Sequence, residues 1–367
     1  MPSAPVPHLT FVLSATTVAI ATLGCRLNQA EAESWVWSLA EAGYRVVGFG
    51  PGADAYVVHT CTVTHIADRK SRQRLLQANR YGPGRVVAAG CFAQRCPEET
   101  LRAGASLLVR APEAVVAAVQ GLLPNPEATG HKPAPASSLA QVKVQEGCSL
   151  GCTYCAIPHV RGRPRSRPMA DVVSDVAHRT ARGYCEVVLT GTLLGMYGKD
   201  LSTPSSLEGL VRALLTSTPA PRLRLSSLQP WDLTPALLHL WSSGRLSGRF
   251  HLPLQSGSSG VLSRMGRCYS PQEYRRAVDR VREAVPGATI TTDLLVGFPG
   301  ETDAEFEESL SLCRDIGFAR IHVFPYSPRP GTLAAGMPGF LPPSVIEERC
   351  RRARALTAPG RLRGIGD

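Results

Sequence analysis

The sequence predicts an α/β protein with two successive regions of parallel β-sheet. Short apolar runs rich in β-branched residues alternate with longer segments of helical periodicity, and this alternation is typical of βαβ units. Gly, Pro and small polar residues bound the runs and mark their ends as turns. The chain has 367 residues, 44% of them hydrophobic, which is enough for two or three domains with cores of their own.

The first region, residues 15–123, is predicted to be a Rossmann-like domain in which three strands each run into a cysteine. The strands are Thr17–Gly24, Ala55–Thr60 and Arg85–Gly90, and they lead into Cys25, Cys61 and Cys91. Helices are predicted between the strands, at Gln29–Ala42 and Ala67–Asn79. Because ligands bind at the carboxyl ends of parallel strands, we expect the three cysteines to converge on one site.

These three cysteines have an alternative interpretation as small buried hydrophobic residues, which free cysteines often are. They are separated by 36 and 30 residues, so no local ligand spacing supports a metal site by itself. A further cysteine, Cys96, lies outside the pattern and is interpreted as structural.

A Pro-rich stretch, residues 124–140, is interpreted as an extended linker. The second region, residues 141–342, is predicted to be an incomplete parallel barrel of six βα units, which has an open side for a macromolecular substrate. Residues 343–367 are predicted to be a basic C-terminal helix and tail. The predicted strands are Gln141–Gln145, Glu186–Leu189, Leu223–Ser226, Phe250–Leu254, Thr289–Val296 and Ile321–Phe324. The predicted helices are Ala170–Arg182, Leu207–Thr216, Pro235–Ser242, Pro271–Val285, Asp303–Ile316 and Val345–Leu356.

The loop after the first barrel strand carries Cys148, Cys152 and Cys155 in the spacing C-x3-C-x2-C. Glycines in the loop let it fold back, so that three thiolates can face one point. Three sulfurs can bind three irons of a 4Fe–4S cube and leave the fourth iron open, whereas an electron-transfer cluster uses four cysteines. A zinc site with His159 as fourth ligand is the alternative that the spacing alone leaves open.

Polar, Gly-rich segments follow the other barrel strands, at the face where barrel active sites lie. Glycine there lets the backbone approach a ligand, and Ser, Thr and Gln offer neutral hydrogen bonds to a ribose or an adenine. The segments are Leu189–Gly195, Ser226–Gln229, Pro253–Gly257, Val296–Glu301 and Phe324–Ser327. Each is also compatible with an ordinary turn. The alternating arginines between Arg161 and Arg167 suggest one phosphate-binding side of an extended segment, or else a solvated basic loop.

The net charge of +11 favours a polyanionic partner such as nucleic acid, and a solvated basic surface explains it equally well. Eleven cysteines, an odd number outside any secreted scaffold, indicate metal binding in a reducing compartment. The apolar stretch Leu9–Gly24 lacks the basic residues that begin a signal peptide, and no other segment approaches membrane-spanning length. We therefore expect a cytoplasmic protein with no membrane partner.

The cysteine loop, with Tyr154 just before its last cysteine, resembles the signature of the radical S-adenosylmethionine (radical SAM) enzymes. The segments LGCRLNQ, HTCTVT and GCFAQ in the first region are similar to motifs of the methylthiotransferases, which are radical SAM enzymes. So are HLPLQSGS, TTDLLVGFPGET and HVFPYSPRPGT in the second region, and the resemblance covers about residues 17–350. Methylthiotransferases insert a CH3–S group into an unactivated C–H bond.

This resemblance implies two 4Fe–4S clusters and S-adenosylmethionine as cofactors. When the family's ligand positions are carried over to this sequence, the catalytic residues Cys148, Cys152 and Cys155 would hold the radical cluster. The auxiliary cluster would be held by Cys25, Cys61 and Cys91. The residues implied to line the S-adenosylmethionine pocket are Tyr154, Gly191, Thr192, Gly195, Ser227, Gln255 and Ser256. A radical made at the first cluster would take a substrate hydrogen, and the auxiliary cluster would deliver the methylated sulfur.

The segments Cys61–Arg72 and Ile157–Gly162 are similar to the branch that acts on N6-threonylcarbamoyladenosine beside the tRNA anticodon. The alternatives are isopentenyladenosine in tRNA, an aspartate of a ribosomal protein, or a truncated RNA-binding homologue without turnover. The implied partners are tRNA and an electron donor of the flavodoxin or ferredoxin type, and the sulfur donor is unknown. Family members usually end in a small RNA-binding barrel, the TRAM domain, which is not visible before Asp367.

Overall fold

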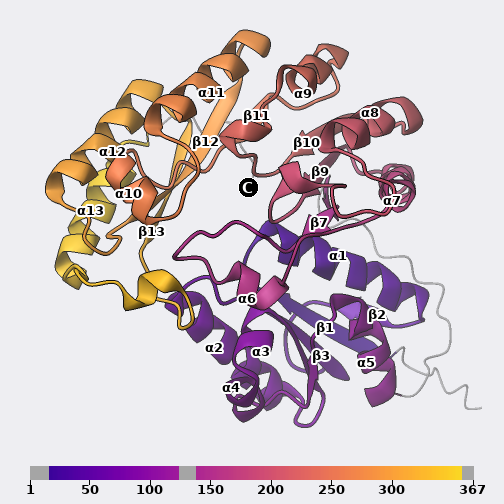
Figure 1. The fold of residues 1–367 in the computed structure, drawn as a ribbon. Coiled ribbons are helices and arrows are strands. Elements are labelled where there is room, and N and C mark those ends of the chain that lie inside the picture. The colour runs from indigo at the N-terminus through magenta and orange to yellow at the C-terminus, as the bar shows by residue number, and fades with distance from the viewer. Residues whose placement is uncertain (1–15, 124–137, 358–367) are drawn as a thin grey trace, which may run out of the picture. The chain divides into compact units, whose positions relative to one another are not determined.

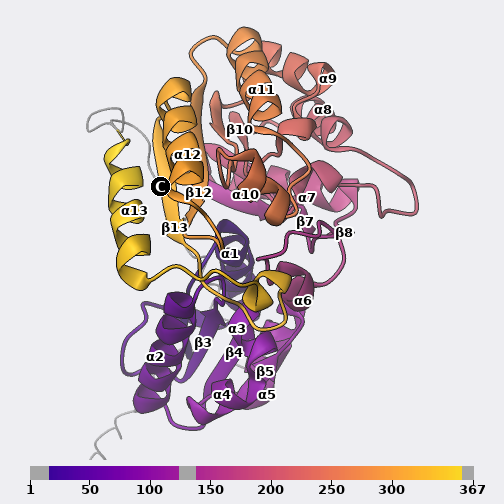
Figure 2. The same ribbon diagram turned by 60° about the vertical axis from the view of Figure 1, so that its left-hand side comes forward.

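The computed structural model describes residues 16–123 and 138–357, which form two compact units. Most of residues 16–123 belong to the first unit, and residues 138–357 belong to the second. Two short segments, Gly24–Glu31 and Thr62–Asp68, belong by their contacts to the second unit, which the sequence did not predict. The predicted linker lies outside the described residues except for residues 138–140. Figures 1 and 2 show the chain from two directions.

One parallel sheet of five strands, in the order β2-β1-β3-β4-β5, forms the centre of the first unit. The strands are β1 Thr17–Thr22, β2 Arg45–Val47, β3 Ala55–Thr60, β4 Val86–Gly90 and β5 Leu107–Val109. The three predicted strands are the central ones, and they are confirmed. The outer strands β2 and β5 were not predicted, because each has three residues and neither is fully buried.

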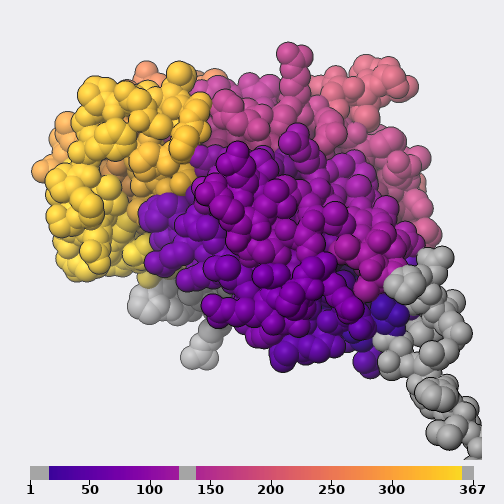
Figure 3. Space-filling model, turned by 90° about the horizontal axis from the view of Figure 1, so that it is seen from below, coloured from indigo at the N-terminus to yellow at the C-terminus, as the bar shows by residue number. Residues whose placement is uncertain are grey.

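Helices cover both faces of this sheet. On one face Val57 packs with Trp35 of the first helix, and on the other face Tyr56 packs with Leu75 and Phe92. A sheet that is buried on both sides requires continuous apolar strands, which explains the run AYVVHT in β3. The helices are α1 Arg26–Glu41, α2 His65–Tyr81, α3 Cys91–Arg95, α4 Pro97–Arg102, η1 Pro112–Ala114 and α5 Val115–Leu122. Residues of this unit are coloured indigo to purple in the space-filling view of Figure 3.

The second unit is an open barrel of six parallel strands, as predicted. One half has the order β10-β9-β6 and the other β11-β12-β13, and a parallel bridge from Ser227 to His251 joins the halves. Within the described residues, no pairing between β6 and β13 closes the barrel. The strands are β6 Leu139–Lys143, β9 Glu186–Thr190, β10 Arg222–Leu225, β11 Arg249–His251, β12 Thr289–Val296 and β13 Arg320–Pro325. The strands β7 Gln145–Glu146 and β8 Arg165–Ser166 form a separate antiparallel pair. Gln145, the last residue of the first predicted strand, belongs to this pair and not to the barrel.

The predicted helices of the second unit are also present, and Figure 1 shows α7, α8, α11 and α12 outside the strands. The predicted capping boxes at Ser270 and Thr302 start α11 and α12. The helices are α6 Ile157–Arg161, α7 Met169–Ala181, α8 Leu207–Ser217, α9 Pro235–His239, α10 Ser259–Arg264, α11 Pro271–Ala284, α12 Asp303–Ile316 and α13 Pro343–Ala355. The 3-10 helices are η2 Leu194–Met196, η3 Pro230–Asp232, η4 Leu240–Ser243 and η5 Leu333–Gly336.

The arginines of α13 are less available to RNA than the sequence suggests. Arg349 is buried and pairs with Glu301 at 2.8 Å and with Asp303 at 2.6 Å. Arg351 and Arg352 pair with Glu348 and Glu307, respectively. Carboxylates of the same unit therefore neutralise most of this helix. No helix in the described part of the chain has the length and apolar character needed to cross a bilayer.

Candidate active site

The loop with Cys148, Cys152 and Cys155 is closed by backbone hydrogen bonds. The Cys148 N–H donates to the Gly162 carbonyl oxygen at 3.0 Å, and the Cys155 N–H donates to the Cys152 carbonyl oxygen at 3.1 Å. Gly147 has a φ of +75°, and a Cβ there would lie 2.1 Å from the Arg163 carbonyl oxygen. The fold-back therefore requires glycine at position 147.

The three thiols of this loop lie close enough to influence one another. Burial, together with the charges of Cys152 and Cys148, raises the pKa of Cys155 to about 12, although an N–H from Ile157 and the charge of Arg267 act to lower it. Burial and the neighbouring Cys152 also raise the pKa of Cys148, against a hydrogen bond from the Leu150 N–H. Three thiolates so near one another repel unless a cation binds them, so this donor set fits an iron–sulfur cluster.

Arg267, which the sequence analysis missed, lies directly against this loop. Its Nη1 donates to Cys152 Sγ at 3.2 Å, and its Nη2 donates to the side-chain oxygen of Gln229. The guanidinium carbon lies 5.0 Å from the centre of the Tyr269 ring. Within the described structure, Arg267 Nε is buried and has no hydrogen-bond partner. Arg267 thus places a fixed positive charge beside a sulfur that would ligate metal.

Tyr154 and Gln255, two residues implied for the S-adenosylmethionine pocket, have unusual environments. Burial raises the pKa of Tyr154 well above its usual value, and its ring meets Phe298 edge-on at 6.5 Å between centroids. Gln255 has a φ of 65° and is the one non-glycine residue with positive φ in the described part of the chain. Its N–H donates to the Asp293 carbonyl oxygen at 2.9 Å, which helps hold this backbone in place. Strained backbone of this kind is concentrated at functional sites.

The remaining residues implied for that pocket have mixed surroundings. Ser256 is fully buried, and its hydroxyl contacts Ser309 Oγ at 3.1 Å and accepts from the Ser258 N–H at 3.2 Å. Ser227 is half-buried at the bridge between the two barrel halves, and Thr192 is half-buried after β9. The hydroxyl of Ser256 is therefore already engaged within the protein.

Neighbouring side chains of the protein leave no room for a Cβ at Gly191 or Gly195. A Cβ at Gly191 would lie 2.9 Å from Gln145 Oε1, and one at Gly195 would lie 1.9 Å from Asp232 Oδ1. Gln145 Oε1 accepts from the Leu193 N–H at 2.9 Å and thereby fixes the loop after β9. The sequence analysis attributed both glycines to close approach of a ligand, and these packing contacts give them a second physical reason.

Asp232 gives the stability of the protein a specific pH dependence. Burial raises its pKa to about 6, although the Gln229 N–H and the charge of Lys199 act in the opposite direction. Because an unfolded aspartate has a pKa of about 3.9, the native state binds the proton more tightly, and its stability falls as pH rises from about 4 to 6. Asp232→Asn should flatten this part of the profile of unfolding free energy, measured by urea denaturation. Parallel profiles for the two proteins would contradict this.

Cys61 and Cys91 follow neighbouring strands of the first unit. Thr60 and Gly90 are register partners at the ends of β3 and β4, so both cysteines leave the sheet at the same edge, and each is 4% exposed. Cys25 is exposed and lies three residues beyond the end of β1, in a segment that belongs to the second unit. Across residues 16–123 and 138–357, no group of three His, Cys, Asp or Glu side chains is already arranged as a metal site, and this includes Cys148, Cys152 and Cys155. The convergence of these three cysteines remains a prediction.

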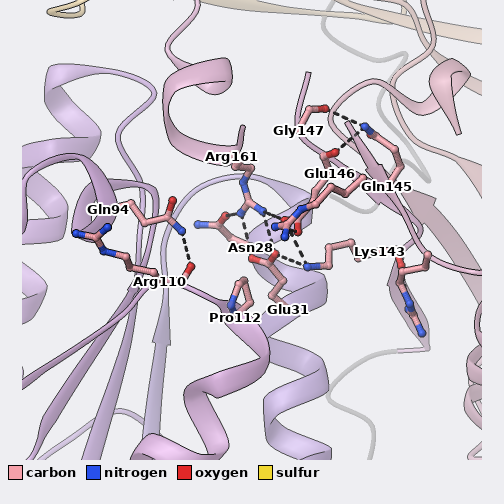
Figure 4. A network of polar contacts seen from close by, with 12 residues as sticks. Asn28, Glu31, Gln94, Arg110, Pro112, Lys143, Gln145, Glu146, Gly147 and Arg161 are labelled. Atoms are coloured by element: carbon pink, nitrogen blue, oxygen red, sulfur yellow. Dashed lines mark hydrogen bonds and ion pairs between the residues drawn. The ribbon is translucent and has the colours of Figure 1, made fainter. Parts of the chain in front are cut away.

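A buried ionic network holds the segment after Cys25 (Figure 4). Arg161 Nη1 contacts Glu31 Oε1 at 2.9 Å and Glu146 Oε2 at 3.0 Å, and Nη2 contacts Asn28 Oδ1 at 2.8 Å. Lys143 Nζ contacts Glu31 Oε1 at 2.8 Å. The side chains of Arg161 and Glu31 are 4% and 2% exposed. The network joins residues that flank the Cys148 loop on both sides to residues just after Cys25.

This network corrects the expectation that the alternating arginines form one phosphate-binding side. Arg161 ends α6 and is buried, and Arg167 pairs with Asp175 at 2.9 Å. Arg165 is 65% exposed and pairs with Glu146 at 2.7 Å. The segment is not one extended strand, so the alternation does not place these side chains on a common outer face.

A second buried contact holds Thr62–Asp68, the segment after Cys61. Arg329 Nη1 contacts Asp68 Oδ2 at 2.7 Å and the Thr62 carbonyl oxygen at 3.1 Å. Ser327 Oγ accepts from the His65 N–H at 3.1 Å. Arg329 and Ser327 belong to the Gly- and Pro-rich stretch after β13, so that stretch positions this segment rather than only ending the barrel.

Comparison with known proteins matches both parts of the chain to known families. Residues 142–313 match the radical SAM superfamily, and residues 17–109 match the family described as uncharacterized protein family UPF0004. The Thermotoga maritima protein named threonylcarbamoyladenosine tRNA methylthiotransferase MtaB is 37% identical, over 95% of this chain and 85% of its own length. The chain belongs to the radical SAM methylthiotransferase family.

Members of this methylthiotransferase family with different named products have similar identities to the chain. The Bacillus subtilis protein named threonylcarbamoyladenosine tRNA methylthiotransferase MtaB is 36% identical, over 93% of this chain and 80% of its own length. A Parafrankia sp. protein named tRNA-2-methylthio-N(6)-dimethylallyladenosine synthase is 34% identical, over 94% and 74%. Among solved structures, the radical S-adenosylmethionine methyltransferase TsrM from Kitasatospora setae matches with a TM-score of 0.63, at 14% identity, over 88% of this chain and 77% of that chain. The last match shows a shared fold.

Proposed function

We propose that this methylthiotransferase adds a methylthio group to carbon 2 of N6-threonylcarbamoyladenosine beside the anticodon of tRNA. The observation that carries the proposal is the hydrogen-bonded loop with Cys148, Cys152 and Cys155, whose thiols influence one another electrostatically, after the first strand of an open parallel barrel. Relatives that bear the corresponding name match nearly the whole chain, which supports this nucleoside. The net charge of +11 suits an RNA substrate.

Each cysteine set would hold one 4Fe–4S cluster. Cys148, Cys152 and Cys155 would bind the radical cluster and leave one iron for S-adenosylmethionine, which supplies the radical that removes the substrate hydrogen. Cys25, Cys61 and Cys91 would bind the auxiliary cluster, the site of the sulfur. Arg267 compensates negative charge at Cys152 Sγ, 3.2 Å from its Nη1. We further propose a flavodoxin or ferredoxin as electron donor and a reducing, cytoplasmic compartment, which the absence of disulfides between the eleven cysteines suits.

Isopentenyladenosine is the second candidate nucleoside, favoured by relatives such as the Parafrankia protein. Mass spectrometry of tRNA nucleosides, in a host that lacks the gene and any paralogue, separates the two. We expect 2-methylthio-threonylcarbamoyladenosine to disappear on deletion and to return with the wild-type gene but not with a Cys152→Ala gene. Loss of the 2-methylthio-isopentenyl product alone would assign the other nucleoside.

Gly147→Ala should prevent the radical cluster from assembling. The added Cβ meets a backbone oxygen at 2.1 Å in a conformation with φ of +75°, so the loop cannot close as it does in the native protein. After anaerobic reconstitution, iron should fall by about four atoms per chain. Gly151→Ala is the matched control, because nothing lies within 4 Å of a Cβ at that position of the same loop. Equal iron contents in the two variants would contradict the prediction.

A further inference from the structure

The helix α2, which follows Cys61 in the chain, has one buried face and one strongly basic face. Its 17 residues include five arginines or lysines and one acidic residue, Asp68. Asp68 is buried and pairs with Arg329 at 2.7 Å, so its charge does not offset the cations of the helix. Leu75 and Ala78 of the buried face pack in the core of the first unit. The charge that α2 presents to solvent is therefore positive.

Three cations of α2 are exposed and have no partner within residues 16–123 and 138–357. They are Arg69, Lys70 and Arg80. Because three turns of an α-helix take about 11 residues, Arg69 and Arg80 lie on one line along the helix, about 16 Å apart. Gln73, which is also exposed, lies close to the same line, and Lys70 lies beside Arg69. We call Arg69, Lys70, Gln73 and Arg80 the basic face of α2.

The two other arginines of α2 are engaged within the protein. Arg72 Nη1 contacts Glu99 Oε2 at 3.1 Å. Arg74 Nη1 donates to Gln77 Oε1 at 3.1 Å, and its guanidinium carbon lies 4.8 Å from the centre of the Phe49 ring. The fold thus uses the cations that border the buried side of α2, whereas those of the basic face contribute no contact to it.

The two basic segments that the sequence suggested for phosphate binding are largely neutralised. Most of their arginines pair with carboxylates of the same unit, namely Arg161, Arg165, Arg167, Arg349, Arg351 and Arg352. The basic face of α2 differs from both segments, because its cations have no such carboxylates beside them in the described structure. The excess positive charge of the chain, +11, is therefore available to a partner at this face.

Unpaired cations in a row along an exposed helix suit a chain of phosphates. Arg and Lys supply most of the affinity of proteins for a nucleic-acid backbone, by neutralising phosphates and releasing their counterions. Two apolar side chains, Ile66 and Leu76, are 39% and 43% exposed on the same side of α2. Single exposed apolar residues of this kind are ordinary at protein surfaces, so the charge decides which partner fits.

We propose that the basic face of α2 binds the phosphate backbone of the tRNA substrate. The inference rests on the proposed function and deepens it, because it names a surface of the protein that holds the RNA. Phosphate contacts fix the position of a nucleic acid without reading its bases. The basic face should therefore add affinity equally for modified and unmodified RNA, and the choice of nucleoside belongs to other residues.

The test compares two triple variants of the reconstituted holoenzyme. One combines Arg69→Gln, Lys70→Gln and Arg80→Gln. The matched control combines Arg222→Gln, Arg314→Gln and Arg354→Gln, which removes the same charge from exposed positions elsewhere. The probes are anticodon stem–loop RNAs with threonylcarbamoyladenosine or unmodified adenosine, and affinity is measured anaerobically between about 50 and 200 mM salt.

The α2 variant should bind both RNAs at least about tenfold more weakly at physiological salt, and its plot of log affinity against log salt should be shallower by about two to three. Methylthio transfer should show a higher KM for RNA with kcat unchanged. The control variant should keep nearly the wild-type slope. In the wild type, acetylation of Lys70, measured by mass spectrometry, should fall when RNA binds and recover in high salt.

Four results would overturn the assignment. Equal losses in the two triple variants would attribute binding to overall charge, and a loss confined to threonylcarbamoyladenosine RNA would mean that the face reads the nucleoside. Unchanged RNA affinity, with altered self-association in sedimentation, would assign the face to a protein partner. Equal acetylation of Lys70 with and without RNA would contradict the proposal without any variant.

Failure of the basic face and failure of the proposed function give different results. A wild type that makes methylthio product on threonylcarbamoyladenosine RNA but leaves Lys70 unprotected would remove the face and keep the function. A wild type that protects Lys70 but makes methylthio product only on isopentenyladenosine RNA would keep the face and remove the proposed nucleoside.

Discussion

Cys152→Ala is expected to reduce cleavage of S-adenosylmethionine to background and to remove about four irons per chain. Cys152 is the middle member of the closed loop, and its sulfur contacts Arg267 at 3.2 Å. Without it, two sulfurs cannot hold a cluster with a single open iron, so both radical formation and methylthio transfer should stop. Formation of 5′-deoxyadenosine under reducing conditions and mass spectrometry of the RNA product measure the two losses separately.

Cys61→Ala should separate these two activities. Cys61 belongs to the set proposed for the auxiliary cluster, so cleavage of S-adenosylmethionine should continue while methylthio product disappears. Cys96→Ala is the matched control, since Cys96 lies in the same unit but outside both sets, and it should retain both activities. If Cys61→Ala still made methylthio product, its place in the auxiliary set would be wrong.

Arg161→Met is expected to destabilise the protein by about 3–5 kcal/mol, because it removes the more deeply buried of the two cations that contact both Glu31 and Glu146. Lys143 is then the remaining cation that contacts both carboxylates. The substitution also frees residues next to Cys25 from residues around the Cys148 loop. Methylthio transfer should therefore fall more than cleavage of S-adenosylmethionine, which a purely global loss of stability would not produce. Urea denaturation gives the first quantity, and the two product assays give the second.

Arg165→Met is the control for Arg161→Met. Arg165 also pairs with Glu146, but its side chain is 65% exposed, and exposed ion pairs contribute about 0–1 kcal/mol. Similar destabilisation by the two substitutions would show that burial does not determine the strength of this network.

Much of the fold was predictable because its signals are local. The bounds predicted for Thr289–Val296 and Asp303–Ile316 are those of β12 and α12, where alternation in the strand and a capping box at the helix fix the ends. The cysteine loop also has a local signal, because Cys148, Cys152 and Cys155 lie within eight residues of sequence, and their role as cluster ligands stays a prediction. The short strand β5 was not predicted, because three residues of which one is buried carry little pattern.

The contacts that position the candidate site were not predictable, because they join residues far apart in sequence. Arg161 meets Glu31 across 130 residues, and Arg267 meets Cys152 across 115. The alternation of arginines after Cys155 suggested an outer face, but the buried acids that bind Arg161 override that local pattern. The sequence suggested that Gly195 faces a ligand, and the fold shows that it also packs against Asp232, which lies 37 residues away in sequence.

Iron and sulfide analysis of the anaerobically reconstituted protein tests the two-cluster account most directly. The wild type should hold about eight irons and eight sulfides per chain, and each of two triple variants should hold about four. One variant replaces Cys148, Cys152 and Cys155 by alanine, and the other replaces Cys25, Cys61 and Cys91. A wild type with about four irons, or a Cys25/Cys61/Cys91 variant that keeps about eight, would contradict the account.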